Sequence, residues 1–156
     1  MYIALENIRS LYNIGAIFRT GSFLGVKNIL LVGYSEKRPL PDGTWELNKK
    51  IEKTSLGTIN DLKIKLLKNS DELIEFAKNN KLKLVVVEQD KKSVSLDKWR
   101  PKKNSVLVFG NEIKGVSKKI MAKANEIIEI PKKGKKTSLN VATTAGIVIY
   151  KASLLI

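Results

Sequence analysis

The sequence predicts an α/β fold, with a mainly parallel sheet and helices on both of its faces. Segments with strand character alternate with segments with helix character along the chain, which is typical of this class. The strand segments are continuous runs of Val, Ile and Leu, as expected for strands buried on both faces. In such sheets ligands bind at the carboxyl ends of the strands. The loops that follow the strands are therefore where we expect a site.

The first predicted elements are a strand, a helix and a second strand. Residues 2–7 form a short apolar run, and residues 13–26 carry apolar side chains at helical spacing. Asn13 is a good N-cap for this helix. Residues 27–33 form a continuous apolar strand. Residues 34–45 contain two prolines and an Asp-Gly pair, which indicate a loop.

The middle of the chain is predicted to contain two helices around an edge strand. Residues 49–57 favour a short helix that ends at Gly57. Residues 62–67 alternate between lysine and apolar residues, as an edge strand does. Residues 70–80 begin with Ser70 as a cap and an acidic first turn, and then continue as a helix.

Three more strands and two helices complete the prediction. The strands are apolar runs at residues 82–89, 105–111 and 126–131. Residues 117–124 form a helix capped by Ser117. Residues 140–155 form a last helix that is apolar on almost every side, so it must be buried in its own core or against another subunit. The loops at strand ends that hold candidate site residues are 33–48, 109–117 and 130–140.

The composition is that of one globular domain without cysteine or histidine chemistry. A length of 156 residues is enough for one domain with its own core. No apolar run reaches about 18 residues and the N-terminus lacks the features of a signal peptide, so we expect a cytoplasmic protein. The absence of Cys and His excludes disulfides, thiolate nucleophiles, Cys/His zinc sites and His general bases.

The charge favours a polyanionic partner. The chain has 29 basic and 15 acidic residues, a net charge of +14, and nucleic acid is the usual partner of so basic a protein. The alternative is a solvated, lysine-rich surface without a partner. The bias toward lysine leaves this alternative open, since the only arginines are Arg9, Arg19, Arg38 and Arg100.

One loop resembles a phosphate-binding loop without being one. The stretch "GNEIKGVS" at 110–117 fits the P-loop spacing, but Val116 stands where the phosphate-gripping lysine is required, so we reject an NTPase. No G-x-G-x-x-G follows a strand either, which excludes a dinucleotide site of that type. Gly110 would let the backbone approach a ligand closely and Gly115 would relieve the tight turn. The alternatives are a plain turn and, for Glu112, a solvated side chain.

The first predicted helix carries a candidate catalytic arginine. Asn13 and Arg19 are six residues apart, about 600° of helical rotation, so they lie on different sides of the helix. If both serve one site, Asn13 must do so from the cap. The alternative for Arg19 is a surface arginine bonded to an acid or to a partner subunit.

Three segments together resemble a known enzyme family. "NIGAIFRT" at 13–20, "VLVFGNEIKGVS" at 106–117 and "IEIPKKGKKTSLNVATTAGIVIY" at 128–150 are similar to the three motifs of the SpoU (TrmH-like) RNA ribose 2′-O-methyltransferases of the SPOUT superfamily. The motifs occur in the same order and the resemblance covers essentially the whole chain. It implies a single domain of residues 1–156 with no appended RNA-binding domain, a C-terminal trefoil knot and a homodimer.

The resemblance also implies the cofactor and its pocket. S-adenosylmethionine would donate the methyl group, without a metal, to a ribose 2′-hydroxyl of tRNA or ribosomal RNA. Backbone amides would meet the adenine edge, so the side chains of the pocket can be plain. The implied donor-binding residues are Val87, Glu88, Gln89, Gly110, Ile130, Ser138 and Leu139.

The resemblance further assigns catalytic residues, with Thr137 as support for them. The implied catalytic set is Arg19, Asn13, Glu112, Ser138 and Asn140. The family often casts the arginine as the base that takes the hydroxyl proton. A guanidinium stays protonated in proteins, so stabilising the developing alkoxide or binding a phosphate is the physical alternative, and both roles stay open here.

RNA contacts are assigned to basic side chains around this pocket. They are Arg9, Arg38, Lys132, Lys133, Lys135 and Lys136. Tyr34 and Trp45 could stack a splayed base or could simply pack. In the family the first and last helices pack across the dimer, so Arg9, Arg19 or the lysine loop of one subunit would complete the RNA site of the other.

Two other classes of function compete with the enzyme. A non-catalytic RNA-binding or ribosome-assembly protein that kept the SPOUT fold would not need Arg19, Glu112, Ser138 and Asn140 together. A nucleotide-binding regulator would need a phosphate fingerprint, which the sequence lacks.

Overall fold

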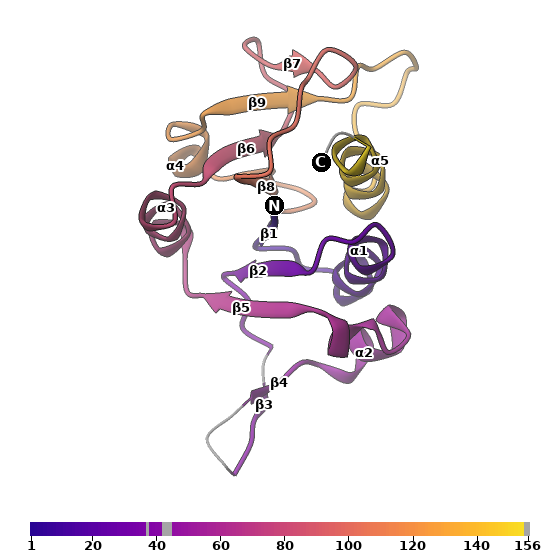
Figure 1. The fold of residues 1–156 in the computed structure, drawn as a ribbon. Helices are drawn as coiled ribbons and strands as arrows, with labels where there is room; N and C mark the ends of the chain where they lie inside the picture. The colour runs from indigo at the N-terminus through magenta and orange to yellow at the C-terminus, as the bar shows by residue number, and fades with distance from the viewer. Residues whose placement is uncertain (37, 42–44, 155–156) are drawn as a thin grey trace.

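The structure, a computed structural model, describes residues 1–36, 38–41 and 45–154. Its centre is a seven-stranded sheet in the order β5-β2-β1-β8-β6-β9-β7 (Figure 1). Every described pair of neighbours in this sheet is parallel, which confirms the predicted α/β class. The strands are β1 (Tyr2–Glu6), β2 (Asn28–Val32), β5 (Lys63–Leu67), β6 (Lys83–Val87), β7 (Val94–Ser95), β8 (Ser105–Phe109) and β9 (Glu126–Glu129).

Helices cover both faces of the sheet (Figure 1). The sheet therefore separates the hydrophobic core into two clusters. One face packs against α1 (Leu11–Phe23), α2 (Lys49–Ser55) and α5 (Val141–Ser153). The other face packs against α3 (Ser70–Asn79) and α4 (Lys118–Met121). Because side chains alternate along a strand, Ile3 and Leu5 of β1 enter the first cluster and Ala4 enters the second. β5 lies at one edge of the sheet, as its alternating pattern predicts.

Two predicted helix caps are wrong by one residue or more. Ser10, not Asn13, caps α1, and its Oγ accepts a hydrogen bond from the Asn13 backbone N–H. Asn69, not Ser70, caps α3 by accepting from the Glu72 N–H. In both places the side chain chosen from the sequence has another partner in the folded chain, described below. The cap at Ser117 is confirmed, with Ser117 Oγ accepting from the Ile120 N–H.

The segment predicted as a loop at 34–45 contains paired backbone. β3 (Arg38–Pro39) and β4 (Trp45–Glu46) form a two-stranded antiparallel sheet that projects from the body of the molecule (Figure 1). The short 3₁₀ helix η1 (Thr58–Asp61) and β7 are also absent from the prediction. Each of these elements has two to four residues, too few to show a hydrophobic period in the sequence.

The last helix is only partly buried within one chain. Ala145, Val148, Ile149 and Ala152 are buried in the core, where α5 packs beside α1. Ile147, Tyr150 and Leu154 are 40%, 55% and 61% exposed, on the face that turns away from the core. Among the described residues no helix is long and apolar enough to cross a membrane.

Candidate active site

The site lies where the loops after β6, β8 and β9 meet at the carboxyl edge of the sheet. A cavity of about 650 Å³ is lined there by residues 87–89, by residues between 109 and 115, and by residues between 129 and 144. This is the volume of a cofactor or drug-sized ligand site. All seven residues predicted to bind the methyl donor line this cavity. Their role stays a prediction, but the fold brings them to one place.

The 110–116 turn forms one wall of the cavity. Asn111 Oδ1 accepts hydrogen bonds from the backbone N–H groups of Ile113 and Lys114 at 3.0 and 2.9 Å. Asn111 Nδ2 donates to the carbonyl of Asn7 at 2.7 Å, which ties the turn to the end of β1. Gly115 has a φ of +68°, a conformation that favours glycine. The turn is thus held by its own second residue.

At Gly110 the close contact is with the backbone of Gly115 and Val116, whereas the sequence predicted a close approach of a ligand. A Cβ atom at this position would lie 2.2 Å from the backbone nitrogen of Val116 and 2.3 Å from the carbonyl carbon of Gly115. The absence of a side chain therefore lets the turn fold back on itself.

Glu88 joins this turn to the end of β6. Its Oε1 accepts from the Val116 N–H at 3.0 Å, and its Oε2 accepts from the Gln89 N–H at 3.3 Å. Gln89 Nε2 donates to the carbonyl of Thr137 at 3.2 Å, which connects the same strand end to the 130–140 loop. Glu88 and Gln89 consequently fix two walls of the cavity relative to each other.

Glu112 links the turn to the start of α1. It accepts from the backbone N–H groups of Arg9 and Ser10, both at 3.0 Å, and from Asn13 Nδ2 at 3.1 Å. Partial burial acts to raise the pKa of Glu112, but the hydrogen bonds from these amides hold it below its ordinary value. Glu112 is thus a carboxylate at neutral pH and accepts hydrogen bonds only.

Asn140 extends this chain of contacts to the last helix. Its Nδ2 donates to Asn13 Oδ1 at 3.2 Å. Its Oδ1 accepts from the N–H groups of Ala142 and Thr143 and so caps α5. Three predicted catalytic residues, Asn13, Glu112 and Asn140, are therefore in one hydrogen-bonded chain. Ser138 is exposed at the same cavity.

Arg19 is not brought to this cavity within one chain. It is exposed on α1, and in the part of the chain that the structure describes its side chain forms no hydrogen bond or ion pair and does not line the cavity. Asn13, in the first turn of the same helix, is bonded to Glu112 and Asn140, which line the cavity, and Arg19 follows six residues later on a different side of the helix. The separation of Asn13 and Arg19 expected from the sequence is thus observed.

The basic residues predicted to bind RNA divide into three groups. Lys132, Lys135 and Lys136 are exposed and line the cavity, and Lys133 is exposed beside them. Arg9 is exposed, with its backbone N–H bonded to Glu112. The side chain of Arg38 lies outside the described part of the structure, as does that of Trp45, the candidate for base stacking.

Tyr34 is held as a packing residue. Its hydroxyl donates to the carbonyl of Glu36 at 2.8 Å and accepts from the Asn48 N–H at 3.3 Å. Burial is the main reason that the pKa of this hydroxyl lies above its ordinary value. Of the two roles weighed for Tyr34, its contacts favour packing over base stacking.

Two residues of the 110–116 turn were missed in the sequence. Asn111 closes the turn with its side chain, and an asparagine directly after a strand-ending glycine is a recognisable signal for such a turn. Ile113 lines the cavity although its side chain is 78% exposed. A ligand in the cavity can cover this exposed apolar side chain. No pattern in the sequence indicates that Ile113 has this position.

Comparison with protein families decides the relationship. The family model described as "SpoU rRNA Methylase family" matches residues 1–150. The chain belongs to this family. The match includes every predicted catalytic and donor-binding residue, from Asn13 to Asn140.

Relatives and solved structures agree with the family. The 23S rRNA (adenosine(1067)-2′-O)-methyltransferase of Streptomyces laurentii is 32% identical over 149 residues, which are 96% of this chain and 52% of the relative. The tRNA (guanosine(18)-2′-O)-methyltransferase of Aquifex aeolicus is 31% identical over 153 residues, 97% of this chain and 68% of the relative.

A solved structure extends the agreement to the fold. The AdoMet-bound rRNA methyltransferase from Sinorhizobium meliloti superposes with a TM-score of 0.83 at 26% identity, over 97% of this chain and 54% of that one. The chain therefore spans between about half and two thirds of the length of these SpoU-family proteins.

Proposed function

We propose that this SpoU-family chain is an S-adenosylmethionine-dependent RNA methyltransferase that acts on a ribose 2′-hydroxyl of tRNA or ribosomal RNA. The observation that carries the proposal is the cavity at the carboxyl edge of the sheet, which all seven predicted donor-binding residues line and the Asn13–Glu112–Asn140 chain borders. The two relatives are named as RNA 2′-O-methyltransferases, and the Sinorhizobium meliloti structure is described as AdoMet-bound.

The chain's own residues have a limited task in this reaction. The sulfonium of the donor supplies an activated methyl group. The protein must hold the hydroxyl in line with that methyl and lower the cost of removing the hydroxyl proton. The chain from Glu112 through Asn13 to Asn140 orients the groups at the rim of the cavity. A guanidinium is a donor and a poor proton acceptor, so we assign Arg19 to stabilising the developing alkoxide.

We propose a homodimer in which each subunit completes the site of the other. Two neighbouring helices expose apolar side chains, Tyr12 and Phe23 on α1 and Ile147, Tyr150 and Leu154 on α5. Arg19 is at helical spacing from Tyr12 and Phe23, at i+7 and i−4, so it shares their face. Several large exposed apolar side chains on two neighbouring helices are typical of a protein interface. A second copy on this surface would receive Arg19 from its partner.

We also propose the trefoil knot for the C-terminal part of the chain. Family membership supports it. A single domain acting in the cytoplasm, where tRNA and ribosomal RNA are found, completes the proposal.

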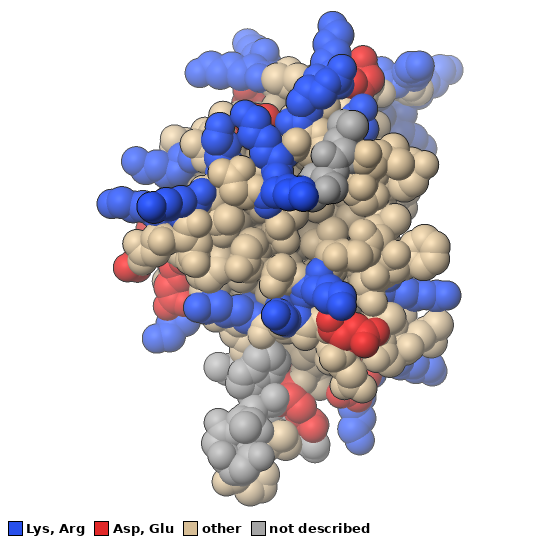
Figure 2. All heavy atoms as spheres, in the orientation of Figure 1, with Lys and Arg blue, Asp and Glu red and all other residues tan. Residues whose placement is uncertain are grey.

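Basic side chains at the rim of the cavity are the proposed RNA-binding groups. Lysines at 132, 133, 135 and 136 supply phosphate contacts, which give affinity without sequence choice. Figure 2 shows Lys and Arg side chains projecting around much of the visible outline of the molecule. This distribution suits a large polyanion better than a small anionic ligand.

Calorimetric titration with S-adenosylmethionine and with its demethylated product tests the proposal. We expect both to bind the wild type and neither to bind Leu139→Trp, because an indole at this half-exposed position fills the cavity without entering the core. Mapping of methylated ribose in bulk RNA then identifies the target. A folded wild type that binds neither compound would instead be a non-catalytic RNA-binding protein with this fold.

A further inference from the structure

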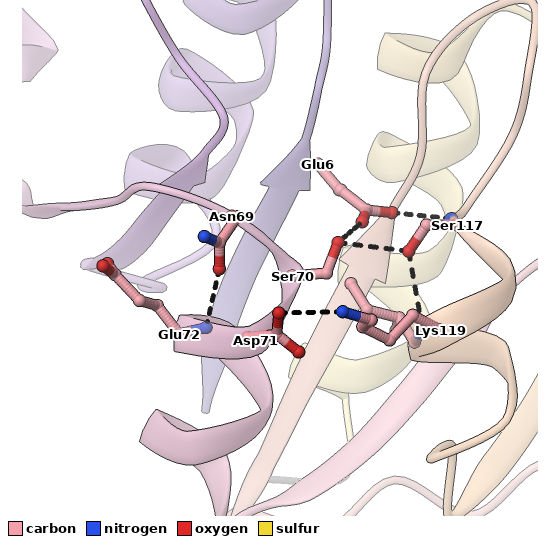
Figure 3. Close-up of polar contacts among 8 residues, drawn as sticks. Glu6, Asn69, Ser70, Asp71, Glu72, Ser117 and Lys119 are labelled. Carbon is pink, nitrogen blue, oxygen red and sulfur yellow. Dashed lines mark hydrogen bonds and ion pairs between the residues drawn. The ribbon is translucent and has the colours of Figure 1, made fainter.

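A buried carboxylate lies behind the donor cavity and has no role in the function proposed above. Glu6 ends β1, and its side chain is 1% exposed. It points to the face of the sheet that α3 and α4 cover, opposite to Leu5. Figure 3 shows Glu6 between Ser70, the first residue of α3, and Ser117, the N-cap of α4. Burying a carboxylate is costly unless hydrogen bonds compensate it, so its partners need an explanation.

The two oxygens of Glu6 hold two different segments. Oε1 accepts a hydrogen bond from Ser70 Oγ, at the start of α3, at 2.6 Å. Oε2 accepts from the backbone N–H of Ser117, before α4, at 2.8 Å. Ser70 Oγ and Ser117 Oγ are 3.2 Å apart and share a third hydrogen bond (Figure 3). In the described part of the chain no Lys or Arg contacts the carboxylate.

Ser117 is the residue that directly follows the 110–116 turn of the donor cavity. The preceding N–H, that of Val116, is held by Glu88, and the N–H of Ser117 is held by Glu6. The backbone of Gly115 and Val116 in turn packs against Gly110 with no room for a Cβ. A shift of Ser117 would therefore be transmitted to the cavity wall.

We infer that Glu6 is a positioning residue for the methyl donor, acting through the Ser117 amide to fix the 110–116 turn. This inference rests on the proposed function, because the turn matters in this way only if the cavity binds the donor. The reach of the carboxylate, rather than its charge, sets the position of the turn. A shorter side chain at position 6 cannot hold α3 and the turn together.

The competing explanation is a purely structural tie between α3 and α4. The same two helices are also joined by the ion pair of Lys119 Nζ and Asp71 Oδ2 at 2.8 Å (Figure 3). Both partners are exposed, so this pair contributes little to stability. A structural tie predicts that donor binding falls only as far as stability falls.

Two substitutions of Glu6 separate reach from charge. In Glu6→Gln the side chain keeps its length: Oε1 can accept from the Ser117 N–H, and Nε2 can donate to Ser70 Oγ, whose own proton then goes to Ser117 Oγ. Glu6→Asp keeps the charge but is one methylene shorter. We expect donor affinity within about threefold of wild type for Glu6→Gln and a loss of about tenfold or more for Glu6→Asp, the scale of one broken buried hydrogen bond.

Ser70→Ala is the matched control. It removes the hydrogen bond to α3 and leaves the contact from Glu6 to Ser117 in place. We expect it to lower stability while donor affinity stays within about threefold of wild type, since the turn keeps its buried hydrogen bond. For Glu6→Asp the methyl-transfer KM for the donor should rise more than kcat falls.

Calorimetric donor titration and urea unfolding of wild type, Glu6→Gln, Glu6→Asp and Ser70→Ala distinguish the positioning role from the structural tie. Equal losses of affinity in Glu6→Asp and Ser70→Ala at equal losses of stability would overturn the inference in favour of a structural tie. A greater loss in Glu6→Gln than in Glu6→Asp would overturn it in favour of charge. If the wild type itself binds no donor, the proposed function fails, which is a different result from either.

Discussion

Glu112 shows how a residue at the surface is held for function by backbone groups. It accepts two main-chain N–H groups and the Asn13 amide, so its pKa is below the ordinary value of 4.5 although partial burial acts in the other direction. As the pH falls, the unfolded chain takes up this proton before the folded chain does. The stability that Glu112 contributes is therefore complete above about pH 4.5 and is lost as the pH falls through the folded-state pKa.

Glu112→Gln should therefore lower the free energy of unfolding at neutral pH by about 1 kcal/mol or less, because the contacts are exposed to solvent. The difference from wild type should disappear in acid below the folded-state pKa. Urea unfolding at a series of pH values measures both. Glu75→Gln is the control, since Glu75 is exposed on α3 and its side chain makes no hydrogen bond or ion pair with the rest of the described chain. A difference that persisted in acid would show that the carboxylate is not the cause.

Residue-level expectations from the sequence failed where a distant partner intervened. Asn13 has the side chain of a good cap, but its amide is bonded to Glu112, 99 positions away, and to Asn140, so Ser10 takes the cap. Ser70 is likewise bonded to Glu6. Local preference cannot anticipate contacts that only the folded chain creates. Glu112 and Asn140 were assigned from the resemblance to a family, because family motifs already reflect which distant residues meet in the folded chain.

At the scale of elements, the 110–116 turn combines a tight fold with a wall of the cavity. Gly110→Ala should distort this turn, because the new Cβ would meet the Val116 nitrogen at 2.2 Å. We expect a loss of about 1–3 kcal/mol in stability, the usual cost of overpacking, together with loss of donor binding. Thermal unfolding with and without S-adenosylmethionine measures both effects in one experiment.

Gly134→Ala is the matched control for this substitution. Gly134 lines the same cavity, and a Cβ built there meets nothing within 4 Å. This variant should unfold and bind like wild type. If both alanine variants bind the donor normally, the turn is not part of the site.

Most elements of four or more residues were predictable, and the two-residue strands were not. β2, β6 and β8 have only five residues each, yet each contains four consecutive buried apolar residues. β3, β4 and β7 have two residues each and no such signal. β7 exists because β9 offers it an edge to pair with, which is a property of the assembled sheet.

At the scale of the whole molecule, the proposed dimer predicts complementation between two inactive variants. Arg19→Ala and Glu112→Gln should each have low methyl-transfer activity. If Arg19 serves the partner's cavity, a mixed dimer has one site with both defects and one intact site. Random mixing in a two-fold dimer should then restore up to about a quarter of wild-type activity.

Activity that stays at the level of the two separate variants after unfolding and refolding together would place Arg19 in its own subunit's site. The measurement is transfer of a radioactive methyl group to bulk RNA, with sedimentation velocity to verify that the mixed species is a dimer.

Salt dependence is the second property of the molecule as a whole. Replacing Lys132, Lys133, Lys135 and Lys136 by alanine should weaken RNA binding and reduce the slope of log affinity against log salt by about 0.7–0.9 for each phosphate that the variant no longer neutralises. A control variant should replace four exposed lysines that precede strands and so lie at the amino ends of the strands, away from the cavity: Lys27, Lys81, Lys102 and Lys123. Equal slopes for the two variants would mean that charge acts without a defined RNA surface.

The cavity draws its walls from segments that span residues 87 to 144, and this has a consequence during synthesis. A nascent chain lacks the 130–140 loop and the α5 cap until residues up to 144 have emerged, so a chain that stops before them has no place for the donor. Once the walls have assembled, bound donor stabilises them, by about 2.7 kcal/mol when its concentration is a hundred times its Kd. Cellular methyl-donor supply would thus act on the lifetime of the newly made protein as well as on its turnover.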